Sequence, residues 1–141
     1  MTTYLGSGDK QRRRTDYRPR WLANLADDVT SEASAINGVL HGPDAVRDVI
    51  SFVKTLYEYQ EFNFVGDYGD HDFLEDYVAR VQGEPIGAVV VVRRNEAGQT
   101  KEVVVSYRPL NAVLLLTRLL AEHFAGTQYA KYFGVPANAT V

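Results

Sequence analysis

Hydrophobic and polar residues along this chain repeat with two different periods, and the change falls near residue 58. Before it, apolar residues at positions 46, 49, 50, 53 and 56 follow the i, i+3, i+4, i+7 spacing of one helix face. Gly42 and Pro43 open this segment, and Asp44 at its start and Lys54 at its end suit the helix dipole. The pattern predicts an amphipathic helix over residues 44–57.

From residue 58 onward, apolar and polar residues alternate, which is the period of a half-buried strand. Short turn sequences, among them Asn95–Gly98, separate the alternating segments. We therefore expect a meander of antiparallel strands. The expected strands cover residues 58–65, 73–82, 86–94 and 100–108.

Three further elements complete the expected order. Residues 18–28 have apolar side chains at helical spacing, and residues 29–42 contain the hairpin signal Asn37-Gly38. Residues 108–126 form the last expected helix, which is apolar around most of its circumference and should be covered on more than one side. Segregated helices and hairpin-connected strands indicate an α+β fold with an antiparallel sheet.

The valine runs at residues 89–92 and 103–105 do not alternate, unlike an antiparallel strand with one wet face. Both faces of this hairpin therefore need cover. Either the last helix folds over the outer face of a monomer, or two copies pack sheet against sheet as a homodimer, the commonest oligomer type. We favour the homodimer.

Composition narrows the class of protein. The 141 residues fit one domain, which we place at residues 18–126 between an N-terminal arm (1–17) and a C-terminal surface tail (127–141). The net charge of −3 argues against nucleic-acid and membrane partners, and we interpret the basic run Lys10–Arg14 as a solvated arm rather than a nucleic-acid patch. Cysteine is absent, which excludes disulfides, thiolate metal sites and a cysteine nucleophile. With no apolar signal segment, we expect a cytoplasmic protein, and we expect no cofactor.

The segment Gly66–Phe73 gathers three aspartates and a histidine beside two glycines. His71 with Asp70 and Asp72 has the residue types of an acid–base pair or a hard-metal site. Neighbouring residues on a strand point to opposite faces, however, and no second histidine lies nearby. We therefore predict a polar turn without a metal, and keep His71 as the weaker catalytic candidate.

Four segments resemble the SnoaL-like polyketide cyclase group, which belongs to the superfamily of nuclear transport factor two and ketosteroid isomerase. They are WLANLADDV, HGPDAVRDVI, YVARVQGEPI and GQTKEVVVSYRPL. The resemblance implies a cystatin-like fold, in which a strongly curved antiparallel or mixed sheet wraps helices into a cone around a mostly apolar pocket. It also implies a dimer. The long first helix usual in that group is shortened or absent here, which leaves Tyr4 and Tyr17 as local candidates for the tyrosine that the isomerases take from it.

The same resemblance argues against ketosteroid isomerisation. The positions that match the carboxylate base and the protonated acid of the isomerases are Ala33 and Val89. Without these two carboxyl groups, proton abstraction beside a carbonyl lacks both its base and its oxyanion donor.

Placed on such a cone, the two-residue period turns Glu75, Tyr77 and Tyr107 inward. Glu75 is the main catalytic candidate, because burial among aromatic and valine side chains raises a carboxyl pKa. The alternative is a solvated Glu75 near the end of the sheet. The predicted ligand-binding residues are Trp21, Tyr77, Val89, Val91, Val105 and Tyr107.

Two functions from different classes stay open. The first is a cone pocket that binds a small hydrophobic molecule, with or without lyase, cyclase or hydrolase chemistry at Glu75. The second is a non-catalytic module for dimerisation or for a protein partner. A cone cavity of roughly 300 Å³ or more favours the first function. A cone filled by Phe62, Phe64, Tyr77 and the last helix favours the second.

Overall fold

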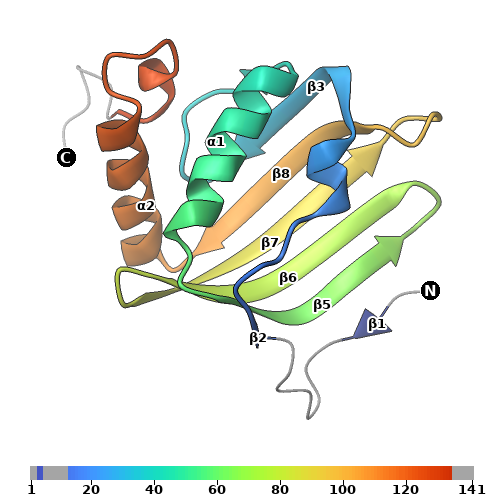
Figure 1. Ribbon diagram of the computed structural model, residues 1–141, viewed down its shortest axis with the longest axis horizontal. Helices are drawn as coiled ribbons and strands as arrows, with labels where there is room; N and C mark the ends of the chain where they lie inside the picture. The colour runs from blue at the N-terminus through green and yellow to red at the C-terminus, as the bar shows by residue number, and fades with distance from the viewer. Residues whose placement is uncertain (1–2, 5–12, 135–141) are drawn as a thin grey trace.

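A single curved sheet and two helices make up the computed structural model, which describes residues 3–4 and 13–134 (Figure 1). The eight strands follow the order β1-β5-β6-β7-β8-β3-β4, with β2 also paired to β5. The strands are β1 Thr3–Tyr4, β2 Arg13–Arg14, β3 Leu25–Ala33, β4 Leu40–His41, β5 Gln60–Tyr68, β6 Asp72–Val81, β7 Glu84–Arg94 and β8 Thr100–Arg108. The helices are α1 Pro43–Leu56 and α2 Leu110–His123.

The predicted meander is confirmed as β5–β6–β7–β8, in which each strand pairs antiparallel with the next. The polar segment at its first turn is also confirmed. Only Gly69 to His71 lie outside the strands there, and Gly69 has φ of 61°, a conformation that glycine adopts without steric cost. Asp67 lies on β5 and forms an ion pair with Arg94 at 3.1 Å. The aspartates therefore belong to a turn and its flanks.

The helix predicted over residues 18–28 is wrong. Only Arg20–Ala23 form a single 3₁₀ turn, and β3 begins at Leu25. The reason is tertiary, because β3 pairs parallel with β8, and the Thr100 amide donates a hydrogen bond to the Asn24 carbonyl at 2.8 Å. Pairing with β8 outweighs the helical spacing of a few apolar residues and makes the sheet mixed.

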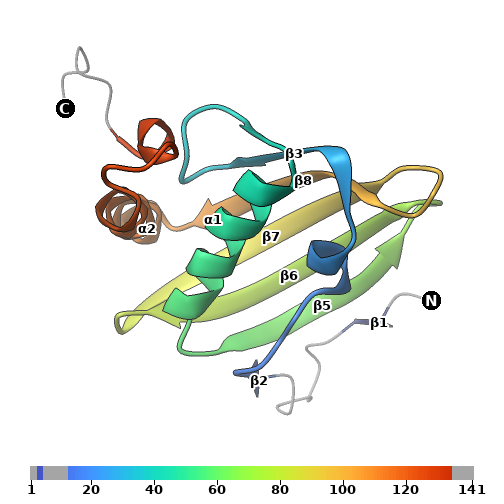
Figure 2. The same cartoon turned by 45° about the horizontal axis from the view of Figure 1, so that its top comes forward.

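Helix α1 matches its prediction and buries Val46, Val49 and Val53 against the concave face of the sheet. Helix α2 packs beside it, and the ring centres of Phe52 and Phe124 are 5.6 Å apart. Both helices lie on the same side of the sheet (Figure 2). The last helix therefore does not fold over the outer face.

Helix α2 is covered on more than one side, as expected, because Val113, Leu115 and Leu119 pack against the core in addition to the buried Leu116, while Leu110 is 70% and Leu114 55% exposed. One expectation for the C-terminal part needs correction. The tail does not lie wholly on the surface, since Phe133 is buried and stacks on Phe124. Residues 135–141 lie outside the described residues.

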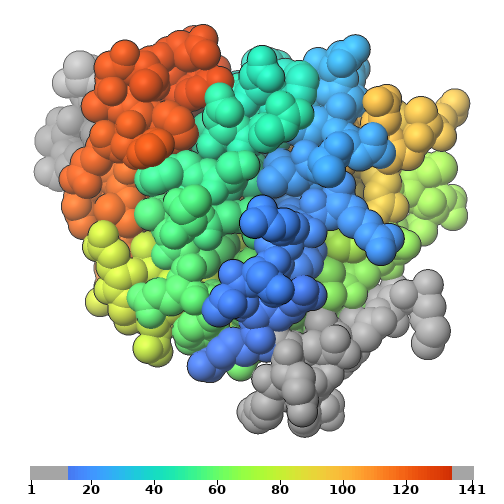
Figure 3. All heavy atoms as spheres, viewed as in Figure 1, coloured from blue at the N-terminus to red at the C-terminus, as the bar shows by residue number. Residues whose placement is uncertain are grey.

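The N-terminal arm is extended where it is described. Strands β1 and β2 both pair antiparallel with β5, which agrees with a first helix that is shortened or absent. Most of the basic run, residues 10–12, lies outside the described residues, as does the side chain of Tyr4. Residues 13–24 then pass over the concave face and lie against α1 (Figures 1 and 3). This passage brings Tyr17 and Trp21 to the middle of the sheet.

Candidate functional site

Glu75 lies at the centre of the concave face, on β6. Alternation along β6 turns Glu75, Tyr77, Ala79 and Val81 inward, and each of these side chains is buried. Glu75 is only 2% exposed, although it is a carboxylic acid. Val65 on β5 and Val90 on β7 are its cross-strand partners. The alternative of a solvated Glu75 is therefore excluded.

Two donors from the N-terminal segment hold the Glu75 carboxyl group. The Tyr17 hydroxyl donates to Oε2 at 2.5 Å, and Trp21 Nε1–H donates to the same oxygen at 3.0 Å. The other oxygen, Oε1, has no hydrogen-bond donor among the described residues. One carboxyl oxygen is thus fixed to the protein, and the other is left to accept or to carry a proton.

The environment of Glu75 favours its neutral form. Burial raises the pKa of Glu75, while the hydrogen bonds from Tyr17 and Trp21 and the charge of Lys54 oppose part of that increase. Burial and the adjacent carboxylate also raise the pKa of Tyr17 far above its ordinary range. Tyr17 therefore keeps its proton and stays a donor at any physiological pH.

A second set of hydroxyl groups lies beside this carboxyl group. The hydroxyls of Tyr57 and Tyr77 are 2.9 Å apart, and either can donate. Burial raises the pKa of Tyr57, Tyr77 and Tyr107 well above the ordinary tyrosine value. The concave face thus carries one proton-accepting acid and several neutral hydroxyl donors.

The interior of the cone is nearly filled, which corrects the expected cone pocket and, by the volume criterion given above, favours the non-catalytic function for the cone itself. A cavity of about 20 Å³ remains beside Glu75, which is room for a single water molecule. The buried Trp21 and Tyr77 line it together with residues of α1, and the buried Phe62 packs behind Tyr77 with 5.4 Å between the ring centres. Phe64, which we expected among the filling residues, pairs with Asp76 after a bulge in β5 and is absent from the core.

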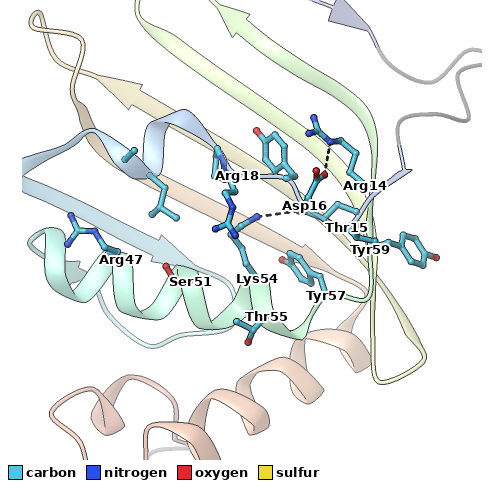
Figure 4. Close-up of a pocket in the computed structure, with 15 residues that line it drawn as sticks. Arg14, Thr15, Asp16, Arg18, Arg47, Ser51, Lys54, Thr55, Tyr57 and Tyr59 are labelled. Atoms are coloured by element: carbon cyan, nitrogen blue, oxygen red, sulfur yellow. Dashed lines mark hydrogen bonds and ion pairs between the residues drawn. The ribbon is translucent and has the colours of Figure 1, made fainter.

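A larger groove of about 450 Å³ opens next to this cavity, between residues 14–23 and α1 (Figure 4). Five residues line both the groove and the interior cavity: Tyr17, Pro19, Lys54, Tyr57 and Gln60. The wall between the groove and Glu75 is therefore one side chain thick. Its central member, Tyr17, is the residue that donates to Glu75.

A wider hollow of about 800 Å³ lies on the other side of the N-terminal segment. It shares two lining residues, Tyr17 and Trp21, with the interior cavity, and like the groove it does not include Glu75. Because the groove of 450 Å³ has the larger shared wall, it is the better route to Glu75.

The structure brings most of the predicted site residues together. Glu75, Trp21, Tyr77, Val105 and Tyr107 all line the interior cavity. Trp21, predicted as a ligand-binding residue, also donates to the candidate acid. The roles of these residues stay predictions, because their positions alone do not test them.

Val89 and Val91 were placed on the wrong face. Pairing of Glu75 with Val90, and of Val90 with Val105, puts Val90 inside and its two neighbours on the outer face. Val90, the residue that faces the interior instead, supplies no carboxyl group for isomerisation either.

The predicted His71 lies away from the site. It is exposed in the β5–β6 turn and lines neither the interior cavity nor the groove. Within the described ranges, no cluster of three or more His, Cys, Asp or Glu side chains has a metal-binding arrangement. None of the helices described is both long enough and apolar enough to cross a membrane.

Sequence reasoning missed Lys54, Tyr57 and Gln60 as site residues. Lys54 was explained as a cation at the end of α1, and the other two lie where helix and strand periods meet. Tyr17 was noted only as a substitute for a tyrosine on a missing helix. Its distance of 58 residues from Glu75 hides their contact from any local pattern.

No protein-family model and no curated protein sequence matches the chain. Solved structures do match it. An uncharacterised bacterial protein with a cystatin-like fold from Silicibacter pomeroyi is 21% identical, with a TM-score of 0.69 over 75% of this chain and 74% of that one. A steroid delta-isomerase from Pseudomonas aeruginosa is 19% identical, with a TM-score of 0.65 over 74% and 80% of the two chains.

A third structure, of a protein of unknown function from Cytophaga hutchinsonii described as NTF2-like, is 15% identical, with a TM-score of 0.51 over 64% of this chain and 75% of that one. At these identities the likeness concerns the fold and not the reaction. The fold that the sequence resemblance implied is confirmed: this chain has the α+β, cystatin-like fold of the nuclear transport factor two-like proteins, with a curved mixed sheet.

Proposed function

We propose that the protein binds a small molecule in the groove between residues 14–23 and α1, and that Glu75 acts there as a general acid–base. One observation carries this proposal. A buried carboxyl group with a raised pKa is hydrogen-bonded to Tyr17, and Tyr17 forms the wall of a groove large enough for a ligand.

The ligand belongs in the groove rather than in the cone. The interior cavity of about 20 Å³ is far below the roughly 300 Å³ of a typical ligand pocket, whereas the groove of about 450 Å³ is above it. The apolar part of the groove consists of Pro19, Leu22 and two tyrosine rings, Tyr57 and Tyr59. An apolar body on the ligand fits this wall.

The chemistry that this arrangement supports is proton transfer to or from a ligand oxygen. When Glu75 is ionised, Tyr17 passes its hydroxyl proton to Glu75 Oε2 while the Tyr17 oxygen takes a proton from the ligand, and the reverse transfer returns that proton. Such a relay serves eliminations, ring closures and hydrolyses that need an acid and then a base. Ketosteroid isomerisation is not among them, because Ala33 and Val90 offer no second carboxyl group.

Nuclear magnetic resonance (NMR) tests ligand binding directly. Aromatic fragments added to ¹⁵N-labelled protein are expected to shift the amide signals of Tyr17, Ser51 and Lys54. Ser51→Trp fills the groove from exposed α1 and should abolish these shifts, while Glu96→Trp in the exposed β7–β8 turn should preserve them. Shifts that survive in Ser51→Trp would place the ligand elsewhere.

The acid–base role is tested by titrating the Glu75 carboxyl carbon by ¹³C NMR. We expect a pKa above the ordinary value of 4.5, because burial is the largest influence on this group. Tyr17→Phe removes a hydrogen bond that favours the carboxylate and should raise the pKa further. Tyr59 lines the same groove without touching Glu75, so Tyr59→Phe is the matched control. A pKa at or below 4.5 in the unmodified protein would end the proposal.

The second candidate function is a non-catalytic dimerisation module, and the outer face of the sheet supports it. Leu74, Val91 and Val104 lie side by side there, on β6, β7 and β8. All three are partly exposed, and none packs against the core. An apolar stripe that no described helix covers fits a second copy of the sheet.

A further inference from the structure

The groove carries cations that have no ion-pair partner among the described residues. Two of its arginines are paired locally, Arg14 with Asp16 at 3.5 Å and Arg47 with Asp44 at 3.4 Å. The other two cations, Arg18 and Lys54, have no carboxylate within 4.0 Å in the described part of the chain. Of these two cations, Lys54 also lines the interior cavity beside Glu75.

Arg18 and Lys54 come from opposite walls and point toward each other (Figure 4). Lys54 Nζ donates to the neutral Gln60 Oε1 at 3.4 Å and lies 5.1 Å from the centre of the Tyr17 ring. Burial lowers the pKa of Lys54, the charge of Glu75 opposes this, and the charge of Arg18 adds a smaller decrease. Two neighbouring like charges in a partly desolvated place disfavour each other unless an anion lies between them.

We infer that the groove takes a small organic carboxylate, with its anionic group between Arg18 and Lys54 and its apolar or aromatic body on Leu22, Tyr57 and Tyr59. This inference rests on the proposed function and names the class of its ligand. A guanidinium group presents two parallel N–H donors that match the two oxygens of a carboxylate. Lys54 lines both the groove and the interior cavity, so an anion bound there keeps the rest of the ligand beside Tyr17.

Carboxylate suits this site better than phosphate. Phosphate sites commonly use the free N–H groups of a helix N-terminus or of a glycine-rich loop. The residues of α1 that line the groove begin at Arg47, beyond the first turn of a helix that starts at Pro43. The groove therefore offers side-chain cations but no N-terminal turn of α1.

Three probes with the same aromatic body test the inference: 2-naphthoate, its neutral amide 2-naphthamide, and 2-naphthyl phosphate. Binding is measured by isothermal titration calorimetry and by the NMR shifts of the Tyr17 and Lys54 amides. We expect 2-naphthoate to bind about tenfold more tightly than the amide, the effect of one charge-assisted hydrogen bond. This preference should shrink in about 1 M salt, which screens exposed charges.

Variants then locate the anion. Arg18→Gln and Lys54→Gln should each weaken 2-naphthoate about tenfold and leave the amide unchanged. Arg47→Gln removes a groove cation that is already paired with Asp44, and it should change the affinity for neither probe by more than about twofold. Lys54→Arg keeps the charge and should retain binding, and thermal unfolding of each variant confirms that it folds.

The outcomes separate the two levels of the proposal. Equal binding of naphthoate and naphthamide, unaffected by Arg18→Gln and Lys54→Gln, would overturn the carboxylate inference and leave ligand binding in the groove intact. Tighter binding of naphthyl phosphate than of naphthoate would replace carboxylate by phosphate. Failure of all three probes to bind would overturn the inference, and the fragment experiment above decides the proposed function separately.

Discussion

At Glu75, both hydrogen-bond donors meet one carboxyl oxygen. Tyr17 and Trp21 therefore orient the carboxyl group without using its second oxygen, Oε1. Oε1 is not one of the buried side-chain atoms without a hydrogen bond in the described residues, so it reaches the small cavity and is not sealed in the core. This accessible oxygen and the raised pKa together make Glu75 the acid–base candidate.

The pH dependence of stability follows from the direction of this pKa shift. Because the folded protein holds the Glu75 proton more tightly than the unfolded chain does, this group favours folding fully below the unfolded value of about 4.5. Its contribution is lost as the pH rises through the higher folded pKa. Glu75→Gln keeps an oxygen that accepts from Tyr17 and Trp21 but cannot ionise.

We therefore expect Glu75→Gln to match the unmodified protein in thermal unfolding near pH 4 and to exceed it near pH 8, while proton-transfer activity is lost. The measurement is the difference in melting temperature across that range. Glu96→Gln, in an exposed turn, is the control and should show no trend. A difference that falls with pH would mean that the carboxylate, not the acid, is the favoured form.

At the scale of elements, α2 shows how weakly an apolar sequence reports burial. Leu110, Leu114 and Leu116 are chemically alike, yet the first two are exposed and Leu116 is fully buried. Leu114 lies at helical spacing with the exposed Arg118 and Glu122, on the narrow side of α2 that the core does not cover.

Two substitutions in α2 give a matched comparison. Leu116→Ala should destabilise the protein by about 2–5 kcal/mol, because it leaves a cavity in the core. Leu114→Ala should cost about 0.5 kcal/mol or less, because that side chain is 55% exposed. Denaturant unfolding of both variants measures the two costs. Similar costs would show that Leu114 is buried in solution, against residues outside the described part or against another molecule.

At the scale of the whole molecule, the outer face of the sheet carries an apolar stripe that no described helix covers, which favours a binding partner there. It is not uniformly apolar, because Asp76 and Arg108 lie 3.6 Å apart beside the valines, and Arg108 extends across Gly87. Asp76 Oδ1 is buried without a hydrogen bond among the described residues. A polar pair of this kind within an apolar stripe can set the register of two packed sheets.

We predict a homodimer through this face. Sedimentation equilibrium should give twice the chain mass of 15.8 kDa at micromolar concentration. Val91→Lys places a charge in the stripe and should give a monomer with nearly unchanged thermal stability. Leu114→Lys alters an apolar residue on exposed α2 and should stay dimeric. A dimer that persists in Val91→Lys and is lost in Leu114→Lys would move the interface to α2.

Local pattern determined α1 and the four-stranded meander, and together with the resemblance to a conical fold it gave the inward direction of Glu75, Tyr77 and Tyr107. It could do so because the spacing of apolar residues records which side of each element is buried. Four consecutive valines do not show which of them face the interior, and Val89 and Val91 were therefore predicted inside. Pairing of β7 with β6 and β8 sets the register and places both on the outer face.

Only the tertiary structure decided the rest. Residues 25–28 form a strand and not the predicted helix. Side chains nearly fill the cone, and a groove lies beside it. The tertiary structure also brought Tyr17, Trp21 and Lys54 to Glu75. These contacts join residues 21 to 58 positions apart, where helix and strand periodicity carry no information and the packing of the N-terminal segment between sheet and α1 determines the result.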